Sequence, residues 1–244
     1  MIRSAGGAIP SGHNIRSHSH PWRQLIYATA GVMTVSTREG SWVVPPHWAL
    51  WAPAQAQHSI VFSGSALLRT LYLSPAEWAE LPPVCTVVTV SPLLREMIAR
   101  AVEIGMLDRR DAVHRALALL IVDAFRTQPT PALDLPMPQS RDLRAIAEEL
   151  SRPSESNVAS LARRFGLGLR SLERRFQLET GMSIGLWRRK ARLMHGLRRL
   201  AAGCAVKDAA LDAGYRTASA FVSAFAATFH TTPGRYFAST PRDN

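Results

Sequence analysis

The chain of 244 residues carries 29 Lys and Arg against 18 Asp and Glu, which gives a net charge of +11. Its length exceeds that of one typical domain, so we expect a two-domain protein. Only two cysteines occur, Cys85 and Cys204, far apart and outside any CxxC pattern, which argues against a disulfide framework and a zinc finger. We find no leader and no apolar run that could span a bilayer, and therefore expect a cytoplasmic protein without a membrane partner.

The positive charge is concentrated in the C-terminal part of the chain. Residues 140–244 hold 18 basic and 9 acidic groups, whereas residues 1–139 hold 11 and 9. All but two of these 18 cations are Arg, whose guanidinium pairs bidentately with phosphate and with guanine. A basic block attracts either a nucleic acid or an anionic membrane surface, and composition alone does not choose between them.

Short apolar runs separated by Gly and Pro follow one another from Gln24 to Leu73. This spacing predicts a small antiparallel barrel or sandwich within residues 1–90. The apolar residues then recur at helical spacing over 93–104 and 113–125, which predicts a pair of amphipathic helices within residues 91–126. Their apolar faces either cover the barrel and each other or form a dimer interface.

Four prolines within residues 127–140 exclude a regular helix there. They predict a stiff, exposed linker, and we place the domain boundary in it.

A helix-turn-helix pattern occupies residues 157–181. Asn157 can cap a first helix, Gly166 to Gly168 can form a tight turn, and a second helix would bury Leu172 and Phe176. The opposite face of that second helix carries three charged side chains, Arg170, Glu173 and Arg174. An exposed N-terminal half of such a helix is the part that enters a DNA major groove.

A second copy of this pattern occupies residues 206–229, with a turn at Gly214-Tyr215. Its outward side is poorer in base-reading groups and carries Arg216, Thr217, Ala218, Ser219, Val222 and Ser223. Between the copies, residues 183–202 predict one long Arg-rich helix that acts as a rigid spacer. We expect Leu169 and Thr217 to open the two recognition helices, 48 residues apart. Held parallel, these helices could enter successive major grooves roughly 34 Å apart.

Residues 141–238 resemble the DNA-binding domain of the AraC/XylS family of bacterial transcription regulators. The motifs that carry the resemblance are LARRFG, the Leu172-Arg174-Phe176 core, Thr180-Gly181, the GY pair, SAFxxAF and the closing TPGRYF. It implies an all-α double helix-turn-helix domain over 141–244 that binds a double-stranded DNA operator, with RNA polymerase as a further partner. By the family's pattern, Arg170, Glu173 and Arg174 match the first set of base contacts, and Ala218, Ser219 and Ser223 match the second.

Three positions depart from this family pattern. Gly168 stands where the family has a capping Ser, and His230 replaces a Gly before the TP motif. The pair His195-Gly196 interrupts a linker helix that is commonly Ala-rich, and we expect the Gly within the helix to cost about 1 kcal/mol relative to Ala. We expect the first copy to make most of the base-specific contacts and the second copy mainly to contact phosphate.

The N-terminal region resembles a cupin barrel in two segments, His18-Ser19-His20 with Gln24, and residues 53–58 ending at His58. In metal-binding cupins the matching residues converge inside the barrel as ligands. Because Gln24 replaces the usual Glu, the alternatives are a divalent metal, a histidine-lined small-molecule pocket or a plain core. Four tryptophans either line such a pocket or pack in the core: Trp22, Trp42, Trp48 and Trp51.

The combined expectation is an α+β two-domain protein, with a cupin-like β-barrel plus two helices before the helical domain. The resemblance implies a non-enzymatic regulator whose barrel senses a small-molecule effector and supports a homodimer. The alternative is a metal-dependent cupin enzyme with a DNA-binding tail. The missing carboxylate at Gln24 and the complete double helix-turn-helix argue against that alternative.

Overall fold

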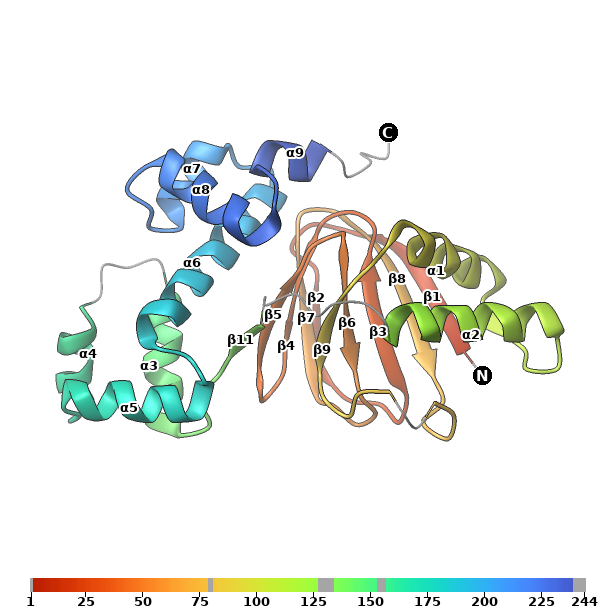
Figure 1. The fold of residues 1–244 in the computed structure, drawn as a ribbon, viewed down its shortest axis with the longest axis horizontal. Coiled ribbons are helices and arrows are strands. Elements are labelled where there is room, and N and C mark those ends of the chain that lie inside the picture. Colours follow the sequence, from red (N-terminus) through yellow and green to blue (C-terminus); the bar gives the residue numbers. More distant parts are fainter. Residues whose placement is uncertain (1, 79–80, 127–133, 153–156, 239–244) are drawn as a thin grey trace. The chain divides into compact units, whose positions relative to one another are not determined.

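A computed structural model describes residues 2–78, 81–126, 134–152 and 157–238. Their coordinates form two compact units (Figure 1). The first unit contains residues 2–37, 42–126 and Asp134, and the second contains residues 38–41 and 135–238. The expected combination of a sheet-rich N-terminal part with a helical C-terminal part is confirmed.

The described strands form two sheets, which make up most of the first unit. The six-stranded sheet has the order β10-β1-β8-β3-β6-β9, and the five-stranded sheet has the order β11-β5-β4-β7-β2. The strands are β1 (Ile2–Ile9), β2 (Asn14–His18), β3 (Arg23–Ala28), β4 (Val32–Ser36), β5 (Gly40–Val44), β6 (Trp48–Ala52), β7 (His58–Ser63), β8 (Ala66–Leu73), β9 (Thr86–Thr89), β10 (Met106–Leu107) and β11 (Asp134–Pro136).

Two of these strands, β1 and β2, precede the region in which the apolar runs predict strands. The sequence of β1, IRSAGGAI, lacks a strong apolar alternation, and half of it is exposed. It is nevertheless held along its whole length by antiparallel pairing with β8, from Ile2 opposite Leu73 to Ile9 opposite Ala66. Tertiary pairing therefore defines a strand that local pattern did not reveal.

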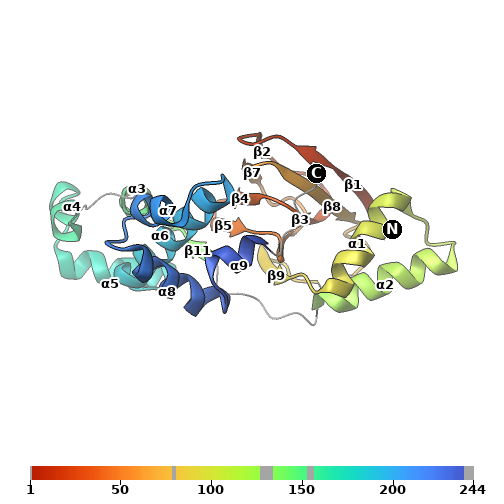
Figure 2. The same ribbon diagram turned by 90° about the horizontal axis from the view of Figure 1, so that it is seen from above.

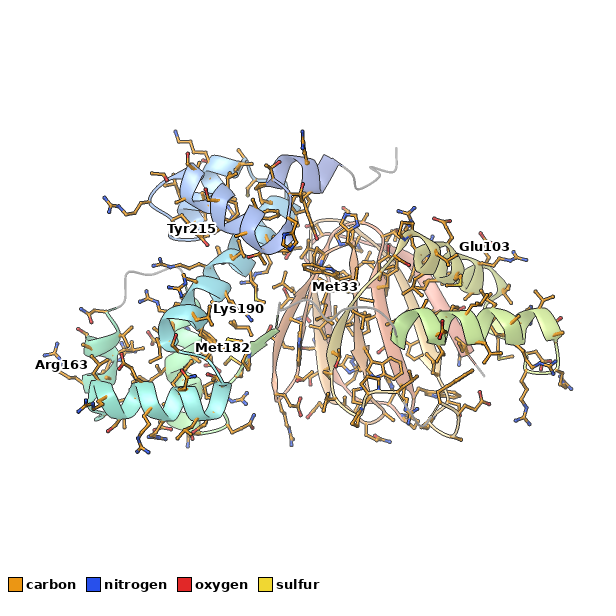
Figure 3. All side chains as sticks on the ribbon, viewed as in Figure 1. Met33, Glu103, Arg163, Met182, Lys190 and Tyr215 are labelled. Carbon is orange, nitrogen blue, oxygen red and sulfur yellow. The ribbon has the colours of Figure 1, made fainter. Side chains whose placement is uncertain are left out.

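The six-stranded sheet separates two apolar cores, because successive strand side chains point to opposite faces. On β3, Leu25 and Tyr27 belong to the core shared with the helices. Ile26 and Ala28 alternate with them and belong to the barrel interior, together with residues of the five-stranded sheet such as Phe62. Met33 of the same interior core is labelled in Figure 3.

Two helices cover the outer face of the six-stranded sheet: α1 (Pro92–Ile104) and α2 (Ala112–Arg126). Ser91 caps α1 by accepting a hydrogen bond from the backbone N–H of Leu94. Buried side chains such as Ile98 of α1 and Ile121 of α2 complete the core on this side. Both views show α1 and α2 next to each other beside β1 and β8 (Figures 1 and 2).

The second unit is helical and contains both predicted helix-turn-helix pairs. Its helices are α3 (Arg141–Ser151), α4 (Val158–Arg164), α5 (Leu169–Thr180), α6 (Ile184–Ala201), α7 (Val206–Asp212), α8 (Ala218–Phe229) and α9 (Pro233–Ala238). The pairs are α4–α5 and α7–α8, and the predicted long spacer is α6, which runs without interruption between them (Figure 1).

The segment that we expected to be an exposed linker is only partly described, since residues 127–133 lie outside the described ranges. Residues 134–136 form β11, and both Leu135 and Pro138 are buried. The carbonyl oxygen of Pro136 accepts a hydrogen bond of 2.8 Å from the indole N–H of Trp187 in α6. The expectation of exposure is therefore wrong for this stretch, because its backbone and its leucine are used in packing.

Among the helices that the structure describes, we find none with the length and apolar character needed to cross a bilayer.

Candidate functional site

The first helix-turn-helix pair is defined by backbone capping and a tight turn. Asn157 caps α4 by accepting a 2.8 Å hydrogen bond from the backbone N–H of Ala159, as the sequence predicts. The turn closes where the N–H of Leu167 donates to the carbonyl of Ala162 at 2.9 Å. Gly166 supplies the positive φ of 68° that this turn requires. The second helix, α5, then begins at Leu169.

Helix α5 is anchored on α3 through two charged side chains that sequence reasoning missed. Arg175 forms a bidentate ion pair with Asp142, with N···O distances of 2.8 and 3.0 Å. One turn later, Glu179 accepts hydrogen bonds from the backbone N–H groups of Gln139 and Ser140, at the start of α3. The hydrogen bonds from Arg175 also hold the pKa of Asp142 below its ordinary value. The sequence offered no signal for these contacts, because the partners of Arg175 and Glu179 lie more than thirty residues away.

The three predicted base-contacting residues of α5 lie on a different face from these anchors. Arg170, Glu173 and Arg174 are all exposed. Over the described part of the chain, none of the three has an ion pair or a side-chain hydrogen bond. The face opposite Leu172 and Phe176, which are fully buried, therefore presents two cations and one carboxylate to solvent.

The spacer helix α6 packs closely against the second pair. Ser183 caps it, and Trp187 is fully buried. A Cβ atom built on Gly196 would lie 2.5 Å from Cε2 of Phe221 in α8, a distance that real contacts do not tolerate. Our expectation that Gly196 merely weakens the helix is thus wrong, because only glycine allows α6 and α8 to approach this closely. Lys190 of the same helix and Arg163 of α4 are labelled in Figure 3.

The second pair repeats the turn of the first. The N–H of Tyr215 donates to the carbonyl of Ala210 at 2.9 Å, and Gly214 has a φ of 77°. Tyr215 lies between α7 and α8 (Figure 3), and burial raises the pKa of its hydroxyl. Thr217 caps α8, since its side chain accepts from the backbone N–H of Ala220 at 3.1 Å.

The second turn is one residue longer than the first. Helices α4 and α7 are offset by 48 residues in sequence, but α5 and α8 start at Leu169 and Ala218, an offset of 49. We expected Thr217 to open α8, but it is the cap and the counterpart of Gly168. Arg216 is consequently the additional residue, which has no counterpart in the first turn.

With this offset, the outward positions of the two recognition helices correspond one to one. Arg170 corresponds to Ser219 and Arg174 to Ser223, and all four side chains are exposed. Glu173 corresponds to Val222, which is partly buried, and Ala218 is partly buried as well. The two helices therefore present different chemistry in the same geometry.

The ends of α5 and α8 correspond in the same way. Gly181 ends α5 in the left-handed conformation at a φ of 69°, and its N–H donates to the carbonyl of Gln177. His230 ends α8 in this conformation at a φ of 55°. A side chain with a Cβ is disfavoured there, so His230 is a local strain that the family's usual Gly avoids.

The histidines predicted in the barrel do come together. His18 ends β2 and His58 begins β7, and the two residues face each other after an irregularity in the β2–β7 register. Ring centroids lie 4.4 Å apart for His18 and His58, and 5.3 Å apart for His20 and His58. A potential ligand atom on each of the three rings lies within 4.8 Å of the others.

Backbone contacts orient all three rings alike. The Nδ1 atom of each ring lies 2.8–2.9 Å from a backbone carbonyl oxygen, that of Arg16 for His18, Trp22 for His20 and Ala56 for His58. A carbonyl oxygen can only accept, so each Nδ1 carries the hydrogen. In a neutral ring the lone pair is then on Nε2, which is the usual arrangement of a metal-binding histidine.

Gln24 completes this cluster from the six-stranded sheet. Its Nε2 donates to Oγ1 of Thr70 at 2.9 Å, and that hydroxyl donates to the carbonyl of Leu25. These bonds turn Oε1 toward Nε2 of His20, 3.0 Å away. Two acceptors at this distance need a proton or a cation to bind both.

The donor set fits a first-row divalent cation, because three imidazole nitrogens and one amide oxygen converge on one place. The Nε2 atom of His58 is buried and has no hydrogen-bond partner among the described residues. Burial, opposed by the bond to Ala56, lowers the pKa of His58, which favours the neutral ring.

The four tryptophans do not form a common pocket. Trp42 belongs to the apolar core of the barrel interior, and Trp48 is partly buried against that core. Trp51 lies in the other core, beneath the helices, where its N–H donates to the carbonyl of Pro82. Trp22 is 36% exposed. For Trp51 the pocket alternative is wrong, because strand alternation places it on the outer face of the sheet.

Comparisons with known proteins match both units. Residues 161–239 match the helix-turn-helix domain family, and residues 5–121 match the family described as the AraC-like ligand binding domain. The HTH-type transcriptional regulator NimR of Escherichia coli (strain K12) is 31% identical over 223 residues, which cover 91% of this chain and 81% of NimR.

Two solved structures are among the proteins to which the chain is similar. ToxT from Vibrio cholerae O395 aligns over 99% of each chain with a TM-score of 0.42 and 9% identity. The DNA-binding domain of AdpA, solved with a target DNA, aligns over 42% of this chain and 92% of that one, with a TM-score of 0.37 and 25% identity. Both TM-scores are below 0.5, so neither alignment supports an argument about function. From the relationship to NimR and the two family matches, the chain belongs to the AraC/XylS family of helix-turn-helix transcriptional regulators that carry an AraC-like ligand-binding domain.

Proposed function

We propose that this regulator reads its operator mainly through α5, while α8 and the turn before it contact the DNA backbone. The observation that supports this division is the difference between corresponding residues. Arg170 and Arg174 are exposed and unpaired within the described structure, and their counterparts in α8 are Ser219 and Ser223. The regulator acts where the chromosome lies, in the cytoplasm of a bacterium.

The chemistry of these side chains defines what each can read. An Arg at a recognition-helix position binds O6 and N7 of guanine, and a Glu accepts from N4 of cytosine. Serine hydroxyls bind several bases and phosphate without strong preference. Arg216 and Thr217 precede α8, where cations and helix N–H groups commonly meet phosphate.

Selection from a random duplex pool tests this proposal. We expect enrichment of a defined site, with the strongest base preference confined to the half contacted by α5. Affinity should fall steeply with salt because the basic contacts displace counterions. A pool that returns no enriched sequence, or a preference equally strong in both halves, would contradict the proposal.

For the barrel, we propose a divalent metal held by Nε2 of His18, His20 and His58 and by Oε1 of Gln24, as part of an effector-sensing cavity. When bound, the metal would supply a Lewis-acidic position for an oxygen or nitrogen of the effector. The supporting observations are the common orientation of the three rings and the unpartnered Nε2 of His58.

Metal analysis of protein purified without an affinity tag tests the cluster. We expect one equivalent of metal in the unaltered chain and in His13→Ala, because His13 is exposed and outside the cluster. His58→Ala should lose it. Absence of metal from the unaltered chain after incubation with Zn²⁺ or Mn²⁺ would refute ligation. We propose no catalytic role for the barrel, and turnover of a small molecule by the metal-loaded chain would overturn this.

We further propose that α2 provides a homodimer contact. Val113, Ala116 and Leu120 lie at i, i+3 and i+7 on one exposed stripe of the helix, with Val113 73% and Leu120 55% exposed. Light scattering after size-exclusion chromatography should show a dimer that Leu120→Glu dissociates. The control Leu93→Glu, at an exposed position of α1, should leave the dimer intact. A monomer in the unaltered chain would refute the contact.

A further inference from the structure

The turn between β4 and β5 belongs to the helical unit. Residues 38–41 join two strands of the ligand-binding part in sequence, yet they group with residues 135–238 rather than with the remainder of the first unit. We call residues 38–41 the hairpin tip. The unit that contains the two recognition helices therefore includes a piece of the N-terminal chain, and the contacts within this unit show what the piece does there.

The hairpin tip is held by α3 and by the segment that precedes α3, residues 135–140, which we call the strap. The backbone N–H of Met137 donates to the carbonyl oxygen of Glu39 at 3.0 Å. The guanidinium of Arg144, in α3, donates to the carbonyl oxygen of Arg38 at 2.7 Å. Both bonds end on backbone oxygens, so they fix the path of the tip rather than the position of one of its side chains.

The tip and the strap are also in direct backbone contact. A Cβ atom built on Gly40 would lie 3.0 Å from the carbonyl oxygen of Leu135, which is closer than most real Cβ contacts. Leu135 is itself buried. Glycine allows two backbones to approach this closely, so β5 and β11 are packed together at this point.

The strap holds the recognition helix α5 as well. The backbone N–H groups of residues 139–140 donate to the carboxylate of Glu179, in α5, at 2.8 and 2.9 Å. The carbonyl of Pro136 accepts from the indole N–H of Trp187, whose ring meets that of Phe176 in α5 edge to face, with centroids 5.7 Å apart. The same six residues are thus bonded to the hairpin tip and to the helix that we propose reads the operator.

The strands that enter and leave the tip are part of the surroundings of the histidine cluster. Ser36, at the end of β4, lies opposite Ser59 of β7, and the preceding residue in β7 is His58. Trp42, in β5, belongs to the apolar core of the barrel interior. A rearrangement around His58 is therefore one strand pair away from the chain that becomes the tip.

We propose that the hairpin tip positions α5 for base reading, and that Arg144 is a positioning residue that acts through the tip and the strap. This inference rests on the proposed reading of the operator by α5. It adds a route from the histidine cluster to that helix: filling the cluster shifts the tip, and the strap transmits the shift to Glu179 and Trp187. A ligand can move such an equilibrium only by its different affinity for two arrangements of the chain.

The specificity ratio of the full chain tests the positioning. This ratio is the affinity for the selected duplex divided by the affinity for a scrambled duplex, both from fluorescence anisotropy. Arg144→Met removes the donor to Arg38 and should lower the ratio at least about fivefold, the size of one well-placed base contact. Arg141→Met, at an exposed position of the same helix, makes the same change of charge and should lower both affinities alike. A smaller folded fraction would also lower both affinities alike, so a merely structural role would leave the ratio unchanged.

A matched pair of glycine variants alters the tip from the side of the barrel. Gly40→Ala pushes β5 away from the carbonyl of Leu135 by a few tenths of an ångström and should lower the specificity ratio. Gly7→Ala, in β1, should not, because its Cβ would meet nothing within 4 Å.

Zn²⁺ is the probe for the route from the histidine cluster. One equivalent should change the affinity of the unaltered chain and of Arg141→Met for the selected duplex at least about fivefold, the lower end of typical coupling between two sites. Arg144→Met should bind the same amount of Zn²⁺ without this change in affinity. His58→Ala, which lacks one of the proposed ligands, should not respond either.

Each contrary result overturns a stated part of the inference. An unchanged specificity ratio in Arg144→Met would overturn the positioning by the tip, and a Gly40→Ala protein that behaves like Gly7→Ala would overturn the contact of β5 with the strap. Zn²⁺ that binds the unaltered chain and leaves its DNA affinity unchanged would overturn the route. Failure of the proposed function is distinguishable, because the unaltered chain itself would then select no duplex or bind no metal, and the dependent part of the inference would fall with it.

Discussion

The two recognition helices, α5 and α8, have the same length and the same buried core positions but different outward surfaces. Each has twelve residues, and Leu172 and Phe176 of α5 correspond to Phe221 and Phe225 of α8. At the outward positions, however, α5 carries arginines where α8 carries serines. The comparison teaches that the fold and the chemistry of the outward face are specified by different positions: duplicated geometry does not require duplicated chemistry.

The turns that precede the two recognition helices also differ. The second turn has the additional residue Arg216 and a capping side chain in Thr217, whereas the first has the bare cap Gly168. The helix with the two outward arginines thus has the weaker cap. Four sets of substitutions test this comparison, and the largest effects are expected for DNA binding.

Exchanging outward residues tests whether α5 makes more of the base-specific contacts than α8. Arg170→Ser and Arg174→Ser, which install the α8 residues in α5, should each cost roughly 1–3 kcal/mol of binding and relax the preference at one base pair. Ser219→Ala and Ser223→Ala should each cost less than about 1 kcal/mol. Affinities for the selected duplex and its single-base variants provide the measurement. An equal loss on every duplex would assign the arginine to the backbone.

Glycine-to-alanine changes within α6 test the close packing on the second pair. Gly196→Ala should destabilise the chain by roughly 1–3 kcal/mol, because the new Cβ overlaps the ring of Phe221. Gly185→Ala is the control in the same helix, since its Cβ would meet nothing within 4 Å, and it should stabilise by up to about 1 kcal/mol. Urea unfolding of both variants gives these free energies. A stable Gly196→Ala protein would show that α6 and α8 can separate at little cost.

Removing the additional cation of the second turn tests the phosphate contact. Arg216→Ala should weaken binding by a similar factor on all duplexes and lower the slope of log K against log salt by about 1. The measurement is a salt titration on the selected duplex and on one with an altered second half-site. A loss confined to one sequence would instead make Arg216 a base-reading residue.

The smallest effects are expected from the caps. Thr217→Ala should cost about 1 kcal/mol of stability, because the N–H of Ala220 loses its acceptor. Gly168→Ser should gain a few tenths of a kcal/mol, since its backbone already has capping angles and a Cβ meets nothing within 4 Å. Thermal unfolding of both variants provides the comparison. Destabilisation by Gly168→Ser would mean that the glycine has another role.

Much of the helical unit was predictable because its signals are local. The spacing of apolar residues, Asn157 as a cap and the two Gly-containing turns are each contained within one turn or one helix, and all are present in the structure. The charged face of α5 was predictable for the same reason. What local pattern missed is the anchoring of Arg175 and Glu179, because their partners lie more than thirty residues away.

In the barrel, sequence motifs indicated the histidines, but only pairing between distant strands places them. His18 and His58 face each other through the β2–β7 register, and Gln24 reaches His20 because Thr70 orients its amide.

For the two recognition helices, the sequence alone determined the helices themselves, their buried stripes and the identity of the exposed charges, all of which depend on periodicity within a short segment. That Arg216 is the additional residue and that Gly196 is required became evident from the three-dimensional structure. Caps and helix starts depend on backbone geometry, and the need for a glycine depends on the distance to a ring in another helix.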